Sequence, residues 1–278
     1  MATHPKVKAP APVVDDVPET VRSENPAPRY GMGYIPDNQS AVVASSRARF
    51  GAPVNLPTSA SIEQHVRRIK DQGQTSSCVG QALSTAIDTR LRALGVEYGE
   101  PSALGAYTLG RTLDKSLGDK LVDDGSRPFY AVSALRKFGI PTEAAWPFDP
   151  YRVNDDLPFD VLLSANKAKI GALYKVDSYG ASRSQDVRLA LSKGFPLMFA
   201  IPVDAKFQSN KGEVVGPMSG PEEGWHMLCL VGYRTVNGVV QFRGVNSWGT
   251  SWGDNGMFWL SEARLYTAKD IYAVEVQS

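Results

Sequence analysis

The sequence predicts an α+β protein of two subdomains, because helical periodicity fills the first half of the chain and strand-like texture fills the second. Apolar residues recur at helical spacing up to about residue 140, whereas short runs rich in β-branched and aromatic residues follow Ile170. The chain has 278 residues, enough to bury a core without disulfides or metals. We find no internal repeat in it.

The first strong helix signal begins at Ser76 and Ser77, which are good N-cap residues, and closes before Gly95. One face of this helix is apolar: Val79, Ala82, Leu83, Ala86, Ile87, Leu91 and Leu94. The pattern is typical of a central, buried helix. Two further helices are predicted over residues 102–113 and 128–138.

The second half is expected to form a sheet. Strands are predicted over residues 173–176, 196–203, 225–233, 239–245 and 257–260, with a short helix around 184–192. This order places the helices before the strands, which is the basis for expecting two subdomains.

Composition excludes two classes of partner. The formal net charge is only +1 and no run of eighteen apolar residues occurs, so we expect no nucleic-acid partner and no membrane. The two cysteines, Cys78 and Cys229, allow at most one disulfide, which indicates a reducing compartment or indifference to redox. Residues 1–21 lack an apolar run of signal-peptide length. We therefore expect the protein to be cytoplasmic or released by a non-classical route. We also expect it to be a monomer.

The first 55 residues read as an N-terminal extension, disordered up to about residue 21. Within it, residues 30–36 (Tyr-Gly-Met-Gly-Tyr-Ile-Pro) form an apolar, aromatic island. Such an island is expected to dock on the rest of the chain. Two interpretations stay open: a strap on the domain surface, or a segment that occludes a cleft.

Cys78 is a candidate nucleophile, because unpaired N–H groups and the dipole at a helix N-terminus stabilise the thiolate. Such a nucleophile needs a base and a set of donors for the oxyanion. His4 lies in the tail and His65 in a polar stretch. His226 opens an apolar run that reads as a buried strand, so it is the base candidate, although a satisfied core histidine would give the same pattern.

Twenty residues after His226, residues 246–256 read Asn-Ser-Trp-Gly-Thr-Ser-Trp-Gly-Asp-Asn-Gly. This block, with Gln72 six residues before Cys78, makes the chain resemble the papain-like cysteine peptidases. The resemblance runs from about Leu56 to the C-terminus.

For the fold, the resemblance implies a helical subdomain over residues 56–171 and a β-barrel-like subdomain over 172–278, with the active-site cleft between them. Where the family usually has disulfides this chain has none, as expected of a bacterial or phage-type member. Thr75 replaces the cysteine three positions before the nucleophile, and Asp123 replaces its disulfide partner. Cys229 is more typical of a small core residue than of a functional thiol.

For the chemistry, the resemblance implies that Cys78 is the nucleophile, His226 its acid/base partner and Asn246 the group that orients the imidazole. The side-chain amide of Gln72 and the backbone N–H of Cys78 would form the oxyanion hole. Because Asn246 is neutral and does not compete for the proton, a thiolate–imidazolium pair can be the resting state. Trp248 either shields the histidine or serves as a core aromatic. No metal or organic cofactor is needed.

The resemblance also implies a set of substrate-binding residues: Gly125, Ser126, Phe129, Trp225 and Met227. Gly125 and Ser126 would pair with an extended peptide, and Lys269 or Asp270 would lie near the floor of a pocket. That pocket is expected to prefer an apolar or aromatic side chain at the second position before the cleaved bond.

The strand register raises one difficulty. Asn237-Gly238 predicts a two-residue hairpin turn, which would pair Asn246 with Cys229 instead of bringing it level with His226. We therefore expect a bulge or a longer loop between Tyr233 and Val239.

The sequence thus predicts a cysteine endopeptidase that hydrolyses polypeptide through a thioester acyl-enzyme. A catalytically silent peptide-binding protein of the same fold and an acyl transferase stay open as alternatives. The extension is shorter than the usual inhibitory prosegment, and we hypothesise that residues 30–36 fold back across the cleft and reduce activity. The sequence does not indicate the natural substrate or biological role.

Overall fold

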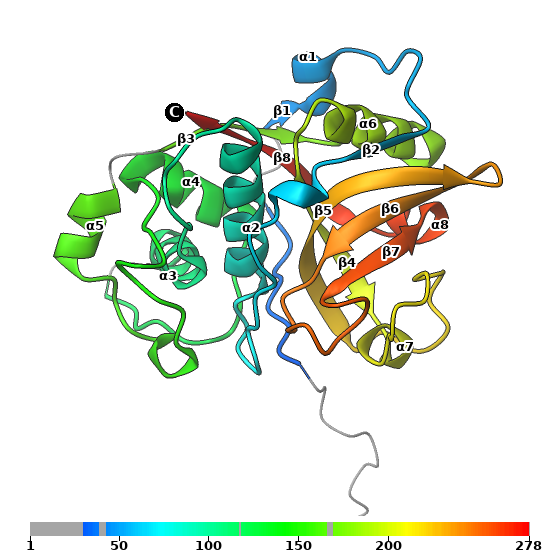
Figure 1. Ribbon diagram of the computed structural model, residues 1–278. Coiled ribbons are helices and arrows are strands. Elements are labelled where there is room, and N and C mark those ends of the chain that lie inside the picture. The colour runs from blue at the N-terminus through cyan, green and yellow to red at the C-terminus, as the bar shows by residue number, and fades with distance from the viewer. Residues whose placement is uncertain (1–29, 39–42, 117, 166–168, 278) are drawn as a thin grey trace, which may run out of the picture.

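The computed structural model describes residues 30–38, 43–116, 118–165 and 169–277. The predicted tail up to residue 21, with His4, lies outside the described residues. Helices α2 to α5 make up one half of the molecule, on the left of Figure 1, and most of the strands make up the other. The helices are α1 (Ser46–Phe50), α2 (Cys78–Ala93), α3 (Ala103–Asp114), α4 (Pro128–Phe138), α5 (Phe159–Ala165), α6 (Gly180–Ser192), α7 (Ala205–Gln208) and α8 (Glu262–Leu265), with 3-10 turns η2 (Glu63–His65) and η3 (Pro150–Arg152).

The strands form one sheet in the order β1-β3-β8-β4-β5-β6-β7, and β2 pairs with β5 beside this path. They are β1 (Ala44–Ser45), β2 (Ser59–Ser61), β3 (Lys169–Lys175), β4 (Leu197–Val203), β5 (Gly224–Val236), β6 (Val239–Val245), β7 (Met257–Ser261) and β8 (Lys269–Gln277). Neighbouring strands are antiparallel except β1 and β3. None of the described helices is both long and apolar enough to cross a bilayer.

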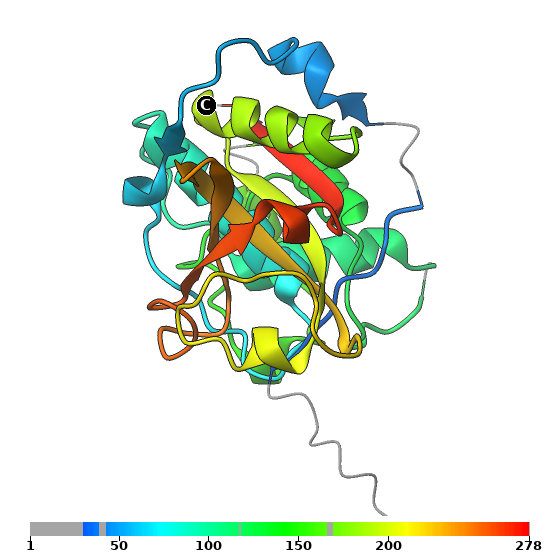
Figure 2. The same ribbon diagram turned by 90° about the vertical axis from the view of Figure 1, so that its right-hand side faces the viewer.

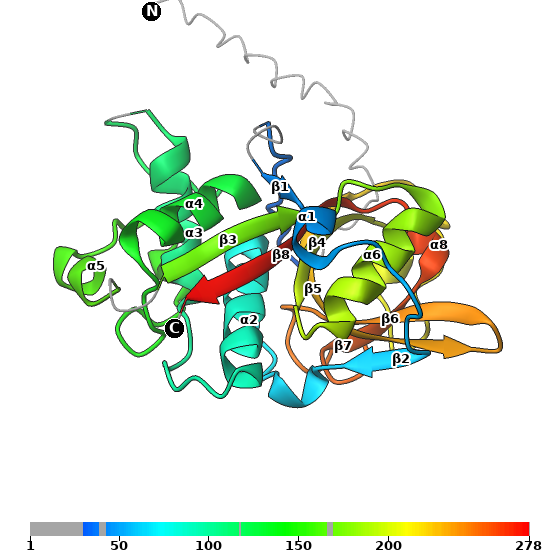
Figure 3. The same ribbon diagram turned by 90° about the horizontal axis from the view of Figure 1, so that it is seen from above.

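Helix α2 is the central helix, as predicted, and almost all of its side chains are buried. It packs on α3 in the helical half and on β5 and β8 of the sheet, whose face it covers in Figure 3. The contact with α3 depends on Gly80, since a Cβ there would lie 2.4 Å from the carbonyl oxygen of Ala103. Ser77 is the N-cap residue, although its side chain makes no capping bond to the helix.

Strand β4 is buried along its whole length and separates two apolar cores. Met198 and Ala200 belong to the core that α2 shares with the sheet. Phe199 and Ile201 point the other way, into the core enclosed by the strands with α6 and α8. A strand buried on both faces explains why its sequence is a continuous apolar run and does not alternate.

The hairpin between β5 and β6 has the predicted two-residue turn, with φ of 52° at Asn237 and 79° at Gly238. Val236 pairs directly with Val239. The expectation of a bulge or longer loop between Tyr233 and Val239 is therefore wrong.

The register shift lies further along the hairpin, between Leu230 and Gly232. Beyond this bulge the pairing moves by one residue, and its continuation brings Asn246 to the face of β5 that carries His226. Without the shift Asn246 would stand opposite Cys229, whose side chain points to the other face.

The N-terminal extension contributes to the fold. Its residues 44–45 add β1 to the edge of the sheet, and α1 packs on α6 (Figure 2). At this contact Arg47 pairs with Asp186 at 2.9 Å. Strand β2 belongs to the sheet although it lies in the segment expected to be helical, and the expected boundary between residues 171 and 172 falls inside β3.

Because α2 is buried at the centre of the molecule, shortening its buried side chains should lower the free energy of unfolding. We expect Leu83→Ala to lower the free energy of unfolding by about 2–5 kcal/mol, because Leu83 is fully buried and its removal leaves a cavity. Leu94→Ala, at the exposed end of the same helix, is the matched control and should cost less than about 1 kcal/mol. Urea unfolding measures both, and equal losses would contradict this description of the core.

Candidate active site

The four predicted catalytic residues come from segments far apart in the sequence. Gln72 lies in the loop before α2, Cys78 is the first residue of α2, His226 lies near the start of β5 and Asn246 directly follows β6. All four side chains are almost completely buried. Helix α2, which begins at Cys78, packs on β5, which carries His226 (Figure 1), and hydrogen bonds link His226 to Asn246 and Gln72 to Ser247.

His226 is held by Asn246. Its Nε2 lies 2.8 Å from Asn246 Oδ1, and that oxygen also accepts a hydrogen bond from the Ser247 N–H at 2.7 Å. Oδ1 is therefore an acceptor, so Nε2 carries the proton of the neutral ring and Nδ1 is the basic nitrogen. Nδ1 is buried and makes no hydrogen bond within the described part of the chain. Trp248 stacks on the imidazole with centroids 4.5 Å apart and covers it from solvent.

Cys78 is held in its neutral form by burial. Burial raises the pKa of its thiol to about 11, and hydrogen bonds from the backbone of Met227 and Gly33 offset only part of this rise. Burial also lowers the pKa of His226 to about 4, although the hydrogen bond that its ring donates to Asn246 acts in the opposite direction. The thiolate–imidazolium pair, which a neutral Asn246 would allow at rest, is therefore not the favoured state in this conformation, because the site is desolvated.

Gln72 is oriented by Ser247, whose hydroxyl donates to Gln72 Oε1 at 2.6 Å. The Nε2 of Gln72 then donates to the carbonyl oxygens of Thr75 at 2.7 Å and Gly31 at 3.0 Å. The amide expected to bind an oxyanion thus already holds a carbonyl oxygen from the N-terminal extension.

Residues 30–38, called the strap below, lie over the candidate site. In Figure 1 this dark-blue segment runs between α2 and β5. Its backbone bonds to the loop before α2 through Gly31 N–H and Gly73 O at 3.1 Å. On the helical half, Ser126 donates its N–H to Gly33 O at 2.8 Å and accepts from Ile35 N–H at 3.1 Å, in a parallel bridge. These backbone bonds therefore hold the strap to two segments of the helical half, the loop before α2 and the segment that carries Ser126.

Three glycines make this close approach possible. A Cβ on Gly31 would lie 2.1 Å from Thr75 O, and one on Gly33 would lie 1.8 Å from Ser76 O. Gly125 has a φ of +106°, and a Cβ there would lie 2.4 Å from Gly33 O. Any larger residue at position 31 or 33 would prevent the strap from lying on the loop before α2.

Side chains fasten the strap at both ends. Tyr30 stacks on Trp248 with centroids 4.5 Å apart and planes 7° apart. At the other end the carboxylate of Asp37 accepts hydrogen bonds from Phe129 N–H at 2.9 Å and Tyr272 Oη at 2.7 Å. Burial raises the pKa of Asp37 to about 6. No local sequence pattern predicts this second anchor, since Asp37 and Tyr272 lie 235 positions apart.

Four of the five predicted substrate-binding residues lie along the strap or beside it. Gly125 and Ser126 meet its backbone, Phe129 bonds to its end, and the Trp225 ring lies against Tyr34 with centroids 6.0 Å apart. Met227 is different, because its side chain is completely buried in the core shared with α2.

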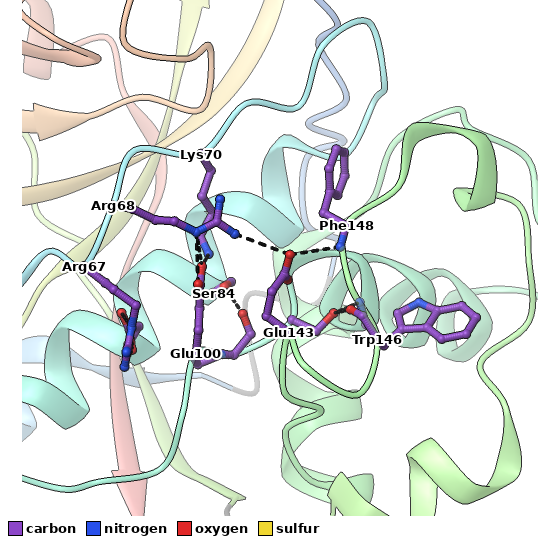
Figure 4. Close-up of polar contacts among 12 residues, drawn as sticks. Arg67, Arg68, Lys70, Ser84, Glu100, Glu143, Trp146 and Phe148 are labelled. Carbon is purple, nitrogen blue, oxygen red and sulfur yellow. Dashed lines mark hydrogen bonds and ion pairs between the residues drawn. The ribbon is translucent and has the colours of Figure 1, made fainter.

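The segment that carries Gln72 is fixed from two sides. Figure 4 shows Lys70 and Arg68 on the carboxylate of Glu100, with Lys70 Nζ at 2.5 Å and Arg68 Nε at 2.9 Å. Arg68 also reaches Glu143, which accepts from the Phe148 N–H. These bonds tie the segment to the helical half, while the carbonyl oxygen of Lys70 accepts from the Gly249 N–H in the other half.

The positions where the resemblance implies a lost disulfide are linked in another way. The carboxylate of Asp123 accepts the N–H of Ser76 at 3.0 Å and the hydroxyl of Tyr107 at 2.7 Å, so hydrogen bonds connect the two segments. Cys78 and Cys229 form no disulfide. Cys229 is a buried core residue on the face of β5 opposite to His226.

No group of three or more histidine, cysteine or acidic side chains that would suit a metal ion occurs in the described ranges.

A model of the family described as "Papain family cysteine protease" matches residues 56–271. The chain is 27% identical to cathepsin B of Dictyostelium discoideum over 242 residues, covering 81% of this chain and 73% of that protein. It is 28% identical to an uncharacterized peptidase C1-like protein of Acanthamoeba polyphaga mimivirus, over 68% of this chain but only 62% of the viral protein.

Solved structures show the same fold. Xylellain, a cysteine protease from Xylella fastidiosa, superimposes with a TM-score of 0.74 at 23% identity, covering 91% of this chain and 98% of that one. A procathepsin B from Trypanosoma congolense gives 0.70 at 19% identity, covering 91% and 88%. The chain therefore has the papain-like α+β fold.

The ion pairs around Lys70 predict a loss of stability when one partner is removed. We expect Glu100→Gln to lower the free energy of unfolding by about 3 kcal/mol, because the ammonium of the buried Lys70 loses its counter-charge. Glu143→Gln is the control, since an amide oxygen still accepts from Phe148 N–H, and it should cost less than about 1 kcal/mol. Urea unfolding that ranks the two variants in the reverse order would contradict this assignment.

Proposed function

Since the chain belongs to the papain family of cysteine proteases, we propose that it is a cysteine endopeptidase that hydrolyses peptide bonds through a thioester acyl-enzyme. One observation carries the proposal: Asn246 fixes the tautomer of His226 so that an unpaired basic nitrogen remains in the buried site that also holds Cys78.

In the proposed reaction the thiol of Cys78 gives its proton to His226 Nδ1, and the sulfur attacks the carbonyl carbon of the peptide. The oxyanion accepts hydrogen bonds from Gln72 Nε2 and the Cys78 N–H. The imidazolium then protonates the leaving amine as the C–N bond breaks, which leaves a thioester. Water, deprotonated by His226, hydrolyses this thioester and regenerates the thiol.

We also propose that the strap keeps the enzyme latent. It excludes substrate from the site, and its Gly31 carbonyl takes the bond from Gln72 Nε2 that an oxyanion would need. The backbone of Gly33 lies directly on the segment that precedes Cys78, since a Cβ on Gly33 would lie 1.8 Å from Ser76 O. The cover of the strap also desolvates the Cys78–His226 pair, which holds both groups neutral.

The two alternatives differ from this proposal in measurable ways. A silent peptide-binding protein would not need a thiol, a base and an orienting amide together in one buried site. An acyl transferase would form the same thioester, but an amine in place of water would attack it and take the acyl group. Product analysis in the presence of an added amine separates hydrolysis from transfer.

The proposed nucleophile predicts the first outcome. Cys78→Ala should abolish cleavage of a fluorogenic peptide while leaving thermal unfolding close to that of the parent chain. Cys229→Ala is the matched control and should retain turnover, because Cys229 lies in the core away from His226. A thiol-directed peptide epoxide should add one mass equivalent, located on Cys78. Turnover that survives in Cys78→Ala would refute the role.

Latency predicts a second outcome. We expect Gly33→Ala to raise kcat/KM at least about tenfold and to speed labelling of Cys78, because the new methyl group would collide with Ser76 O and displace the strap. Gly220→Ala is the control, since a Cβ there meets nothing within 4 Å. This variant keeps the whole chain, whereas deletion up to about residue 52 would also remove β1 and α1. Equal activity in both variants would argue against latency.

A further inference from the structure

One side chain of the strap enters the protein instead of lying across it. Tyr34 is buried, with 7% of its surface exposed, and lies against Trp225 at one side of the cleft. Its hydroxyl donates to Asp270 Oδ2 at 2.6 Å. Its backbone is the part of the strap that bridges Ser126, the residue expected to pair with a substrate. Tyr34 therefore occupies a side-chain pocket next to the position where substrate backbone is expected.

The carboxylate of Asp270 lies at the bottom of this pocket, and one of its two oxygens contacts residues outside the strap. Asp270 Oδ1 lies 2.9 Å from Lys175 Nζ and 3.3 Å from Tyr272 Oη. The other oxygen, Oδ2, is bonded only by strap groups among the described residues: the hydroxyl of Tyr34 and the N–H of Asp37 at 3.0 Å. When the strap leaves, Oδ2 loses both donors, and a new donor must replace them.

The charge balance indicates which donor fits. Lys175 already neutralises Asp270, and the ammonium of Lys269 lies 4.1 Å from the centre of the Trp225 ring at the same pocket. A guanidinium or ammonium from a substrate would add a further positive charge beside these two. A phenol adds none and supplies one O–H to Oδ2, while its ring packs on Trp225 as that of Tyr34 does.

We propose that this pocket selects tyrosine at the substrate residue that pairs with Ser126, with Asp270 as the residue that determines the specificity. The inference rests on the proposed peptidase activity and goes beyond it by naming the side chain that is recognised. Tyr34 is then a built-in stand-in for the substrate tyrosine.

The expected selectivity is for a hydroxyl and not only for an aromatic ring. Phenylalanine would fill the same space but leave Asp270 Oδ2 without a donor, and this side chain is only 8% exposed with the pocket filled. A site built to bind a hydroxyl rejects the analogue that lacks it, because the buried acceptor is left unpaired. We expect kcat/KM for tyrosine to exceed that for phenylalanine by about tenfold to a hundredfold.

The test uses the full chain carrying Gly33→Ala and three fluorogenic peptides that differ only in having Tyr, Phe or Arg at this position. The expected order of kcat/KM is Tyr, then Phe, then Arg. Adding Asp270→Ala should reduce the ratio of Tyr to Phe to about one. Asp270→Asn should retain a preference for Tyr, because its amide oxygen still accepts and asparagine tolerates the φ of 45° found here.

Three results would overturn the inference: equal rates for Tyr and Phe, a preference for Arg, or a Tyr preference that persists in Asp270→Ala. Thermal unfolding checks that Asp270→Ala is folded. If that variant does not fold, Asp270→Asn decides: the inference is overturned if this variant still cleaves the Phe peptide but has lost the preference for Tyr. Failure of the peptidase proposal looks different, since none of the three peptides would then be cleaved.

Discussion

The geometry of the candidate site depends on one backbone constraint, the bulge between Leu230 and Gly232. Side chains alternate between the two faces of a strand, so a shift of one residue decides whether Asn246 and His226 share a face. The tight turn at the end of the hairpin would by itself put them on opposite faces. The bulge corrects this, and the hydrogen bond that sets the tautomer of the imidazole becomes possible.

Burial serves two purposes in this molecule that conflict at the active site. The same packing that makes α2 a stable central helix also surrounds its first residue, Cys78, and a desolvated thiol is a poor nucleophile. Removing the strap would let water solvate one side of Cys78 and His226, and the dipoles of this water would stabilise their charged forms. The protein core can then stay intact while the chemistry of the site changes, because the cover is a separate segment.

Much of the fold could be predicted from the sequence because local patterns encode it. Helical periodicity predicted α2 to α4, and apolar runs predicted β4 to β7, since these elements bury continuous faces. The motif that begins at Asn246, together with Gln72, predicted the candidate site. Long-range pairing was not legible: β2 and β8 were missed, and the place of the bulge was wrong, because both depend on partners distant in sequence. The bonds between Asp37 and Tyr272 were out of reach for the same reason.

The strap and the sheet belong to one covalent chain, and only a few residues separate Asp37 from β1, which is paired with β3. A cover attached so closely has a high effective concentration at its own binding site, independent of how much protein is present. Dissociation of the strap is then followed by rapid rebinding unless something occupies the site first. Dilution should not activate such an enzyme, whereas a single cut between the strap and β1 would make its release permanent.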